Sequence, residues 1–114
     1  MSTYAPSTIR RPNTTRQGHR FNADTIQAVW NTAQVIPGVD CNVRRKERCG
    51  AIIDWSQYGD TTQHRTGWEI DHIKLVAKGG SDDLSNLQPL QWQNNRAKGD
   101  SYPASDYCVV AARQ

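Results

Sequence analysis

Residues 68–76 read Trp-Glu-Ile-Asp-His-Ile-Lys-Leu-Val. They are followed by Lys-Gly-Gly-Ser-Asp-Asp-Leu-Ser-Asn-Leu at 78–87 and by Gln-Asn-Asn-Arg-Ala-Lys-Gly-Asp at 93–100. The first segment predicts a strand, and the Gly-Gly pair after it predicts a loop. A second strand is predicted over 84–90 and a helix over 91–98. The order of strand, loop, strand and helix decides the fold.

Four polar side chains in these segments have the chemistry of a metal-assisted reaction. Asp71 supplies an anionic oxygen and Asn95 an amide oxygen, and hard divalent cations prefer both. His72 can accept a proton near neutral pH, and Asn86 can brace a loop by bonding to its backbone. Neighbouring side chains of a regular strand point to opposite faces. We therefore expect the strand to end, bend or bulge where Asp71 and His72 meet.

These motifs resemble the HNH nucleases, which are one-metal endonucleases with a ββα-metal fold. The final histidine of that motif is an asparagine here, which gives the HNN variant. The resemblance implies a small α+β domain in which Asp71 and Asn95 bind the metal and His72 is the general base. It also implies that Asn86 braces the loop that holds the histidine.

Composition alone does not separate Asn94 from Asn95 as the metal ligand. The family pattern places asparagine before Arg-x-Lys, which is Arg96-Ala97-Lys98 in this chain, and this favours Asn95. Lys98 lies three residues beyond Asn95 and therefore shares its helical face. It can contact a phosphate or stabilise the fold. Glu69 lies on the same strand face as Asp71 and is a candidate for a supporting acid or a further metal ligand.

The activity that the resemblance implies is metal-dependent hydrolysis of phosphodiester bonds in DNA, with low sequence specificity. An amide oxygen in place of the last imidazole favours Mg²⁺ or Mn²⁺ over Zn²⁺ or Ni²⁺. Two alternatives remain open. The first is a DNA-binding module that has lost catalysis. The second is the same nuclease acting as an antibacterial toxin or effector that an inhibitor or immunity protein holds in check. A phage or mobile-element nuclease, with a partner protein from that source, predicts a similar activity in a different context.

Basic residues are concentrated in the N-terminal part of the chain. Residues 1–48 hold eight Lys or Arg and three acidic residues, a net charge of +5, whereas 49–114 hold six and eight, a net charge of −2. A basic surface favours a polyanion, and contacts to phosphates carry no sequence information. We expect the arginines of segment 10–20 to contact phosphates. The candidate nucleic-acid-binding residues are Arg44, Arg45, Lys46, Arg48, Arg96 and Lys98.

A length of 114 residues and a mean hydropathy of −0.79 fit one small domain. Residues 1–20 are polar and predict a disordered basic tail, which leaves 21–114 as the nuclease domain. No apolar run is long enough to span a membrane, and no secretory signal is visible. We therefore expect a cytoplasmic location or export by a route that needs no cleavable signal.

Cys41, Cys49 and Cys108 are widely spaced and include no Cys-x-x-Cys pair. The spacing predicts reduced thiols and no structural zinc, and a Cys41–Cys49 disulfide stays open for an exported protein.

Residues 23–36 predict an amphipathic helix that starts after Asn22 and covers the sheet. His64 and Arg65 can face a substrate, although the sequence favours a polar loop at these positions. Three tryptophans are predicted to pack in the core rather than to stack on bases, namely Trp55, Trp68 and Trp92.

Overall fold

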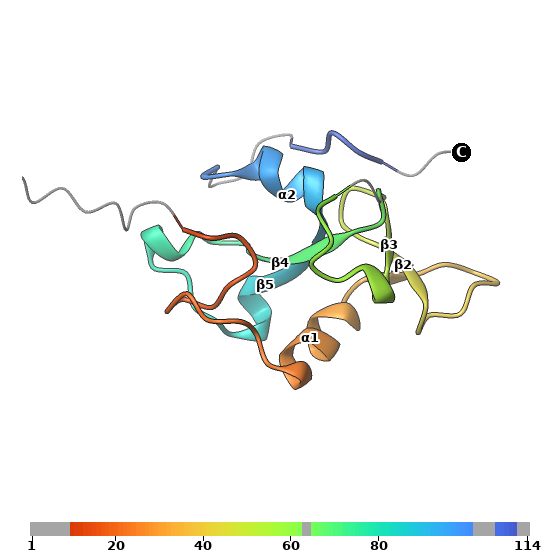
Figure 1. Ribbon diagram of the computed structural model, residues 1–114, viewed down its shortest axis with the longest axis horizontal. Coiled ribbons are helices and arrows are strands. Elements are labelled where there is room, and N and C mark those ends of the chain that lie inside the picture. The colour runs from red at the N-terminus through yellow and green to blue at the C-terminus, as the bar shows by residue number, and fades with distance from the viewer. Residues whose placement is uncertain (1–9, 63–64, 102–106, 112–114) are drawn as a thin grey trace, which may run out of the picture.

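The structure is a computed structural model that describes residues 10–62, 65–101 and 107–111. Two α-helices and two small antiparallel sheets form the fold (Figure 1). The predicted α+β class is therefore confirmed. Among the described residues, no helix has the length and apolar character needed to cross a membrane.

The centre of the fold is a ββα unit. Strand β4 (Trp68–His72) pairs antiparallel with β5 (Leu87–Gln91), and the register runs from Trp68 opposite Gln91 to His72 opposite Leu87. Helix α2 (Trp92–Lys98) follows β5 directly. The Gln91 side chain caps the helix by accepting hydrogen bonds from two backbone N–H groups of its first turn. The helix is thereby held against the sheet at the end of β5.

Both strands are shorter than the sequence predicts. β4 ends at His72 instead of Val76. Ile73 N still donates to Asn86 O in the register of the ladder, but Lys74 N donates to the Asn86 side chain instead of to a backbone carbonyl. The chain continues through two 3₁₀ turns, Val76–Lys78 and Leu84–Asn86, which the periodicity did not indicate.

Helix α1 (Ala23–Trp30) covers this unit, as predicted. Asn22 caps it by accepting from Thr25 N at 2.8 Å. The helix ends at Trp30 rather than at residue 36, because Gln34 and Val35 form β1 (Gln34–Val35) and pair with another strand. A tertiary strand pairing thus overrides the helical periodicity of the sequence.

Aromatic rings fill the core between α1 and the ββα unit. Trp30 and Trp68 are completely buried, with ring centroids 5.2 Å apart. Trp55 and Tyr58 pack against Trp68 from outside this pair. Burying such rings removes a large apolar area from water and stabilises the domain. The expectation that Trp55 and Trp68 are packing residues is confirmed.

A second sheet joins the first through a buried carboxylate. Its order is β1, β2 (Arg44–Lys46) and β3 (Ile52–Asp54). Glu47 follows β2 and is 3% exposed. It accepts hydrogen bonds from Cys49 N, Ala51 N and Gln91 N and from the Asn94 side chain. A buried carboxylate is tolerated where its oxygens are satisfied in this way, and here it ties the second sheet to β5 and α2.

The prediction of reduced thiols is wrong for two of the three cysteines. Cys49 and Cys108 form a disulfide, while Cys41 is free. The bond closes a loop between residues 59 positions apart, a separation that no local pattern signals. It holds residues 107–111 beside α2, where Asn94 bonds to both Val110 N and Val110 O.

Replacing both Cys49 and Cys108 with alanine will lower the free energy of unfolding by about 2–4 kcal/mol, because the unfolded chain loses its cross-link. Urea denaturation of the oxidised protein and of the double variant measures this difference. Cys41→Ala is the matched control and leaves the response to a reductant unchanged. Equal midpoints for the oxidised wild type and the double variant would contradict the prediction.

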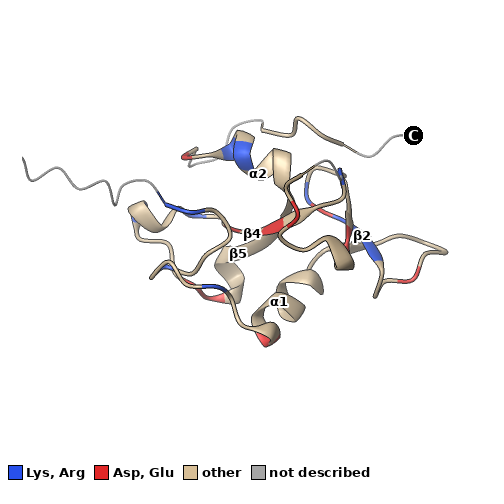
Figure 2. Cartoon of the chain, viewed as in Figure 1, with Lys and Arg blue, Asp and Glu red and all other residues tan. Residues whose placement is uncertain are grey.

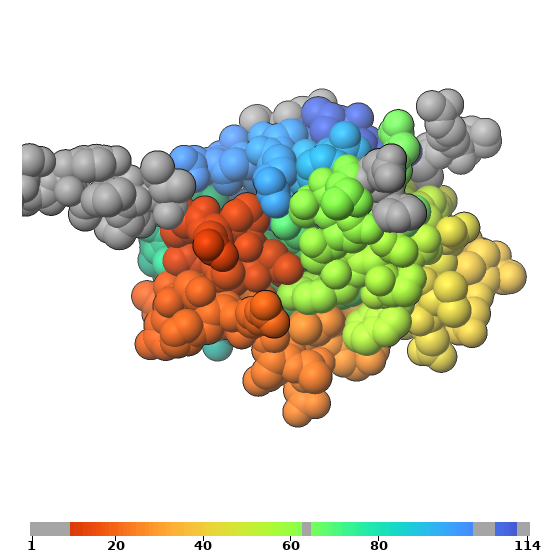
Figure 3. Space-filling model, viewed as in Figure 1, coloured from red at the N-terminus to blue at the C-terminus, as the bar shows by residue number. Residues whose placement is uncertain are grey.

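The N-terminal segment 10–20 follows a defined path, although the sequence predicts disorder through residue 20. Asn13 Oδ1 accepts from Tyr58 Oη at 2.9 Å and from Ile70 N at 2.8 Å. Asn13 has a φ of 61°, a left-handed conformation that asparagine adopts more readily than most residues. In Figure 3 this red and orange segment packs against the body of the molecule. The remainder of the predicted tail, residues 1–9, lies outside the described residues.

Candidate active site at the end of strand β4

An open pocket of about 190 Å³ lies at the end of β4. Asp71, His72 and Asn95 all line it, together with Arg96 and residues of the N-terminal segment. β4 keeps its register with β5 through His72, so the strand is not bulged. His72 is the last residue of β4, and a pocket across a strand end is reached from both faces. The strand therefore ends where the sequence required it to end, bend or bulge.

Asp71 lies on the side of β4 that faces α2. Its Oδ2 accepts from Gln88 Nε2 at 2.9 Å, and its Oδ1 accepts from Lys98 Nζ at 3.2 Å. Burial raises the pKa of Asp71 above its ordinary value, against the opposing effects of the Gln88 hydrogen bond and the Lys98 charge. The carboxylate is thus held in place by two donors and opens onto the pocket.

His72 lies on the opposite side, where its ring contacts Phe21 with centroids 6.0 Å apart. Its side chain is 9% exposed. Nε2 lies 2.7 Å from Asp82 Oδ1. One ring nitrogen is therefore engaged by a carboxylate, and Nδ1 is the other nitrogen of the ring.

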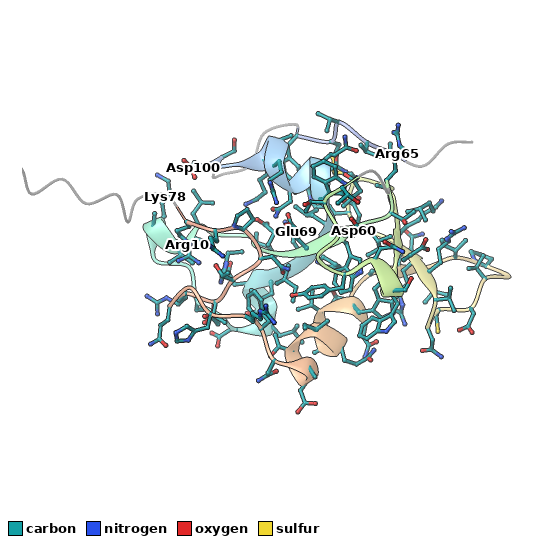
Figure 4. The ribbon with its side chains drawn as sticks, viewed as in Figure 1. Arg10, Asp60, Arg65, Glu69, Lys78 and Asp100 are labelled. Atoms are coloured by element: carbon teal, nitrogen blue, oxygen red, sulfur yellow. A yellow bond between two sulfur atoms is a disulfide. The ribbon has the colours of Figure 1, made fainter. Side chains whose placement is uncertain are left out.

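Asn95 and Asn94 have different surroundings. Asn95 Nδ2 donates to Glu69 Oε1 at 2.9 Å, and Arg96 pairs with the same carboxylate at 3.0 Å. With its nitrogen bonded to Glu69, the amide of Asn95 turns its oxygen to the other side. Asn94 is completely buried and bonds to Glu47 and Val110. Asn95 lines the pocket and Asn94 is not among its lining residues, while Glu69 (labelled in Figure 4) accepts a hydrogen bond from the Asn95 amide. Asn95 as the metal ligand stays a prediction.

Asn86 bonds to the backbone of the loop after β4. Its Oδ1 accepts from Lys74 N at 2.8 Å, and its Nδ2 donates to Lys74 O at 3.1 Å and to Ser81 O at 2.8 Å. A Cβ on Gly80 would lie 1.8 Å from Lys74 O, so only glycine fits there. The Asn86 side chain therefore spans the loop that begins immediately beyond His72.

Lys98 is buried rather than directed toward solvent. It is 1% exposed, and besides Asp71 its Nζ donates to His72 O at 3.0 Å. Of the two roles open for Lys98, this placement favours a structural and electrostatic one. Arg96 is the exposed basic residue of α2, since 47% of its side chain is accessible.

Three of the four basic residues at 44–48 bond to other parts of the protein. Arg44 pairs with Asp54 at 2.7 Å, and Arg48 bonds to Tyr107 Oη. Arg45 is 8% exposed, lies over the Trp30 ring and donates to three carbonyl oxygens. None of the four basic residues of this segment lines the pocket, and we no longer propose Arg45 as a phosphate contact.

The arrangement fits a hard divalent cation bound mainly by water and substrate. Within the described residues, no cluster of three or more His, Cys, Asp or Glu side chains could hold a metal ion. Asp71 and Asn95, which carry a carboxylate and an amide, line the same pocket. Mg²⁺ is bound in this manner, by one or two protein oxygens with waters and phosphate completing its shell.

Two residues beside the site were not predicted from the sequence. Asp82 contacts His72, but in the sequence nothing distinguishes it from Asp83. Asn13 bonds to β4 across 57 residues, and no local pattern indicates such a contact. His64 lies outside the described residues, and Arg65 is exposed in the segment that leads to β4.

The described residues form a small α+β domain with a ββα unit and a pocket at the end of β4. Residues 47–101 match the model of the HNH endonuclease family, so the resemblance is confirmed for this part of the chain. An HNH domain has a nuclease-like or DNA-binding function, and the family generally uses a divalent metal. No curated protein and no solved structure matched the chain.

Proposed function

We propose that this protein hydrolyses phosphodiester bonds of DNA with one divalent cation, Mg²⁺ or Mn²⁺. The observation that carries the proposal is the single pocket that collects His72, Asp71 and Asn95 at the end of β4. A divalent cation bound there would stabilise negative charge on the phosphoryl and leaving oxygens. Asp71 and Asn95 would hold it.

In this proposal the protein supplies a base and fixed geometry. His72 takes a proton from the attacking water through Nδ1, because its Nε2 faces Asp82. Asn86 fixes the loop that starts beside the histidine. Glu69 fixes the Asn95 amide. Holding water, phosphate and base in line accelerates the reaction. Their translational and rotational entropy is lost on binding, so it does not add to the barrier of the chemical step.

The DNA backbone would lie between the N-terminal segment and α2. Arg10 and Arg11 line the pocket on one side and Arg96 on the other. Figure 2 shows basic positions of both elements around the acidic positions of β4. Arg11 and Arg96 are the phosphate contacts that we propose, and such contacts read no base sequence. This supports cleavage with low sequence specificity.

Supercoiled plasmid is the substrate that tests the proposal. We expect nicked or linear product with Mg²⁺ or Mn²⁺ and unchanged plasmid in EDTA, with cleavage restored when excess Mg²⁺ is returned. Gel-shift binding of the same plasmid in EDTA separates binding from cleavage. Intact plasmid with every metal, together with a retained gel shift, would replace this proposal by a DNA-binding module without catalysis.

A further inference from the structure

Asp82 joins the candidate base to the N-terminal segment. Its Oδ1 lies 2.7 Å from His72 Nε2. The backbone N–H of Arg16 donates to both oxygens of the same carboxylate, at 3.0 Å to Oδ1 and 3.2 Å to Oδ2. The Asp82 carboxylate therefore lies between a ring nitrogen of His72 and the segment around Arg16, which is more than fifty residues before His72 in the sequence.

The chemistry of this contact selects one form of the imidazole. An ionised carboxylate has lone pairs and no proton to donate, so the neutral histidine beside it must carry its proton on Nε2. Nδ1 then has a free lone pair. A carboxylate in this position holds an imidazole in one tautomer and one orientation. Phe21 packs beside the ring, with the two centroids 6.0 Å apart.

The N-terminal segment is built to hold Asp82 in place. The Arg10 guanidinium donates to the carbonyl oxygens of Thr14, Thr15 and Arg16 and fixes the turn between them. Asn13 fastens the same turn to Ile70 N at the edge of β4. Arg16 N, which bonds to Asp82, is therefore anchored to the strand that carries His72.

We propose that Asp82 is a positioning residue for His72, and that segment 10–16 holds its carboxylate for this purpose. The inference deepens the proposed function, because it assigns the Nδ1 lone pair of His72 to proton transfer. A segment far from the family motif thereby becomes part of the site. Asp82 itself is not among the residues that line the pocket.

The test is the proton position on the His72 ring, read by long-range ¹H–¹⁵N NMR of the full chain without metal or DNA. We expect the wild type to hold its proton on Nε2, with slow exchange of that proton. In Asp82→Ala the two nitrogen signals should move toward the average of exchanging tautomers. Asp83→Ala is the matched control, since Asp83 is the neighbouring acid, and its spectrum should equal that of the wild type.

A wild-type proton on Nδ1 would overturn the proposal, and so would an Asp82→Ala spectrum identical to the wild type. The wild-type measurement needs no variant, so the test does not depend on the folding of Asp82→Ala. The NMR measurement also requires no DNA cleavage. A protein that does not cleave DNA would therefore contradict the proposed function without deciding whether Asp82 positions His72.

Kinetics give a second readout. Asp82→Ala should lower kcat about 10- to 100-fold with KM nearly unchanged, since a misoriented base impairs chemistry more than binding. In the His72→Ala background the same substitution should have no further effect on kcat. An equal loss in both backgrounds would show that Asp82 acts through the fold rather than through the histidine, and would overturn the assignment.

Discussion

Replacing His72 with alanine will lower kcat for plasmid cleavage by about 10²- to 10⁴-fold, the usual contribution of a positioned general base. The ring belongs to the last residue of β4, which lines the pocket with Asp71 and Asn95, and within the described part of the chain only its Nε2 makes a hydrogen bond. Alanine removes the proton acceptor and leaves both candidate metal ligands. Cleavage rates at saturating Mg²⁺ measure the loss.

His19→Ala is the matched control for this experiment. His19 is exposed in the N-terminal segment and does not line the pocket, so cleavage should keep its wild-type rate. Thermal unfolding of both variants checks that the domain remains folded, because His72 also contacts Phe21. A folded His72→Ala protein that cleaves at the wild-type rate would exclude His72 as the base.

The ββα unit could be predicted from the sequence because its signals are local. The Asp71-His72 pair, the Gly79-Gly80 loop and the Asn95-Arg96 segment lie within about thirty residues and fix both the element order and the pocket. The family match over 47–101 covers the same residues. Asn86 bonds to the loop next to His72, where the motif led us to expect a brace.

The rest of the site depends on contacts between distant parts of the chain. Asn13 accepts a hydrogen bond from Ile70, and Cys49 forms a disulfide with Cys108. The local sequence around these residues does not indicate which distant residue each one contacts. The polar composition of segment 10–20 resembles a disordered tail, but its polar groups bond to β4 and to Asp82. The burial of Lys98 could not be predicted either. A lysine three residues after Asn95 is equally compatible with a solvent-exposed helix face and with a buried one.

Lys98→Met will destabilise the metal-free protein by about 3–5 kcal/mol, a large effect for one residue of α2. Lys98 Nζ is the cation beside Asp71, and it also satisfies His72 O. Methionine fills similar space but leaves a buried carboxylate without its counter-charge and a carbonyl without a donor. Urea denaturation at pH 7 in EDTA measures the loss. Lys78→Met, at the exposed Lys78 of Figure 4, should stay within about 0.5 kcal/mol of the wild type.

The double variant Asp71→Asn/Lys98→Met should recover most of this stability, because no uncompensated charge remains beside the pocket. If Lys98→Met lost stability through packing alone, the double variant would be at least as unstable as the single one. Comparing the single and the double variant therefore separates the effect of the Lys98 charge on stability from the effect of its side-chain volume.

Acid should weaken the effect of Lys98→Met. Burial raises the pKa of Asp71 in the folded protein, and removal of the ammonium raises it further. Between the ordinary pKa of aspartic acid, about 3.9, and this raised value, the folded state binds more protons than the unfolded state. Its stability then increases as the pH falls. The difference in the free energy of unfolding between Lys98→Met and the wild type should become smaller in this pH window, because a protonated Asp71 is neutral and needs no neighbouring cation. A gap that stays constant from pH 7 down through the window would mean that the ion pair contributes nothing, and that Lys98 acts only as a hydrogen-bond donor and packing group.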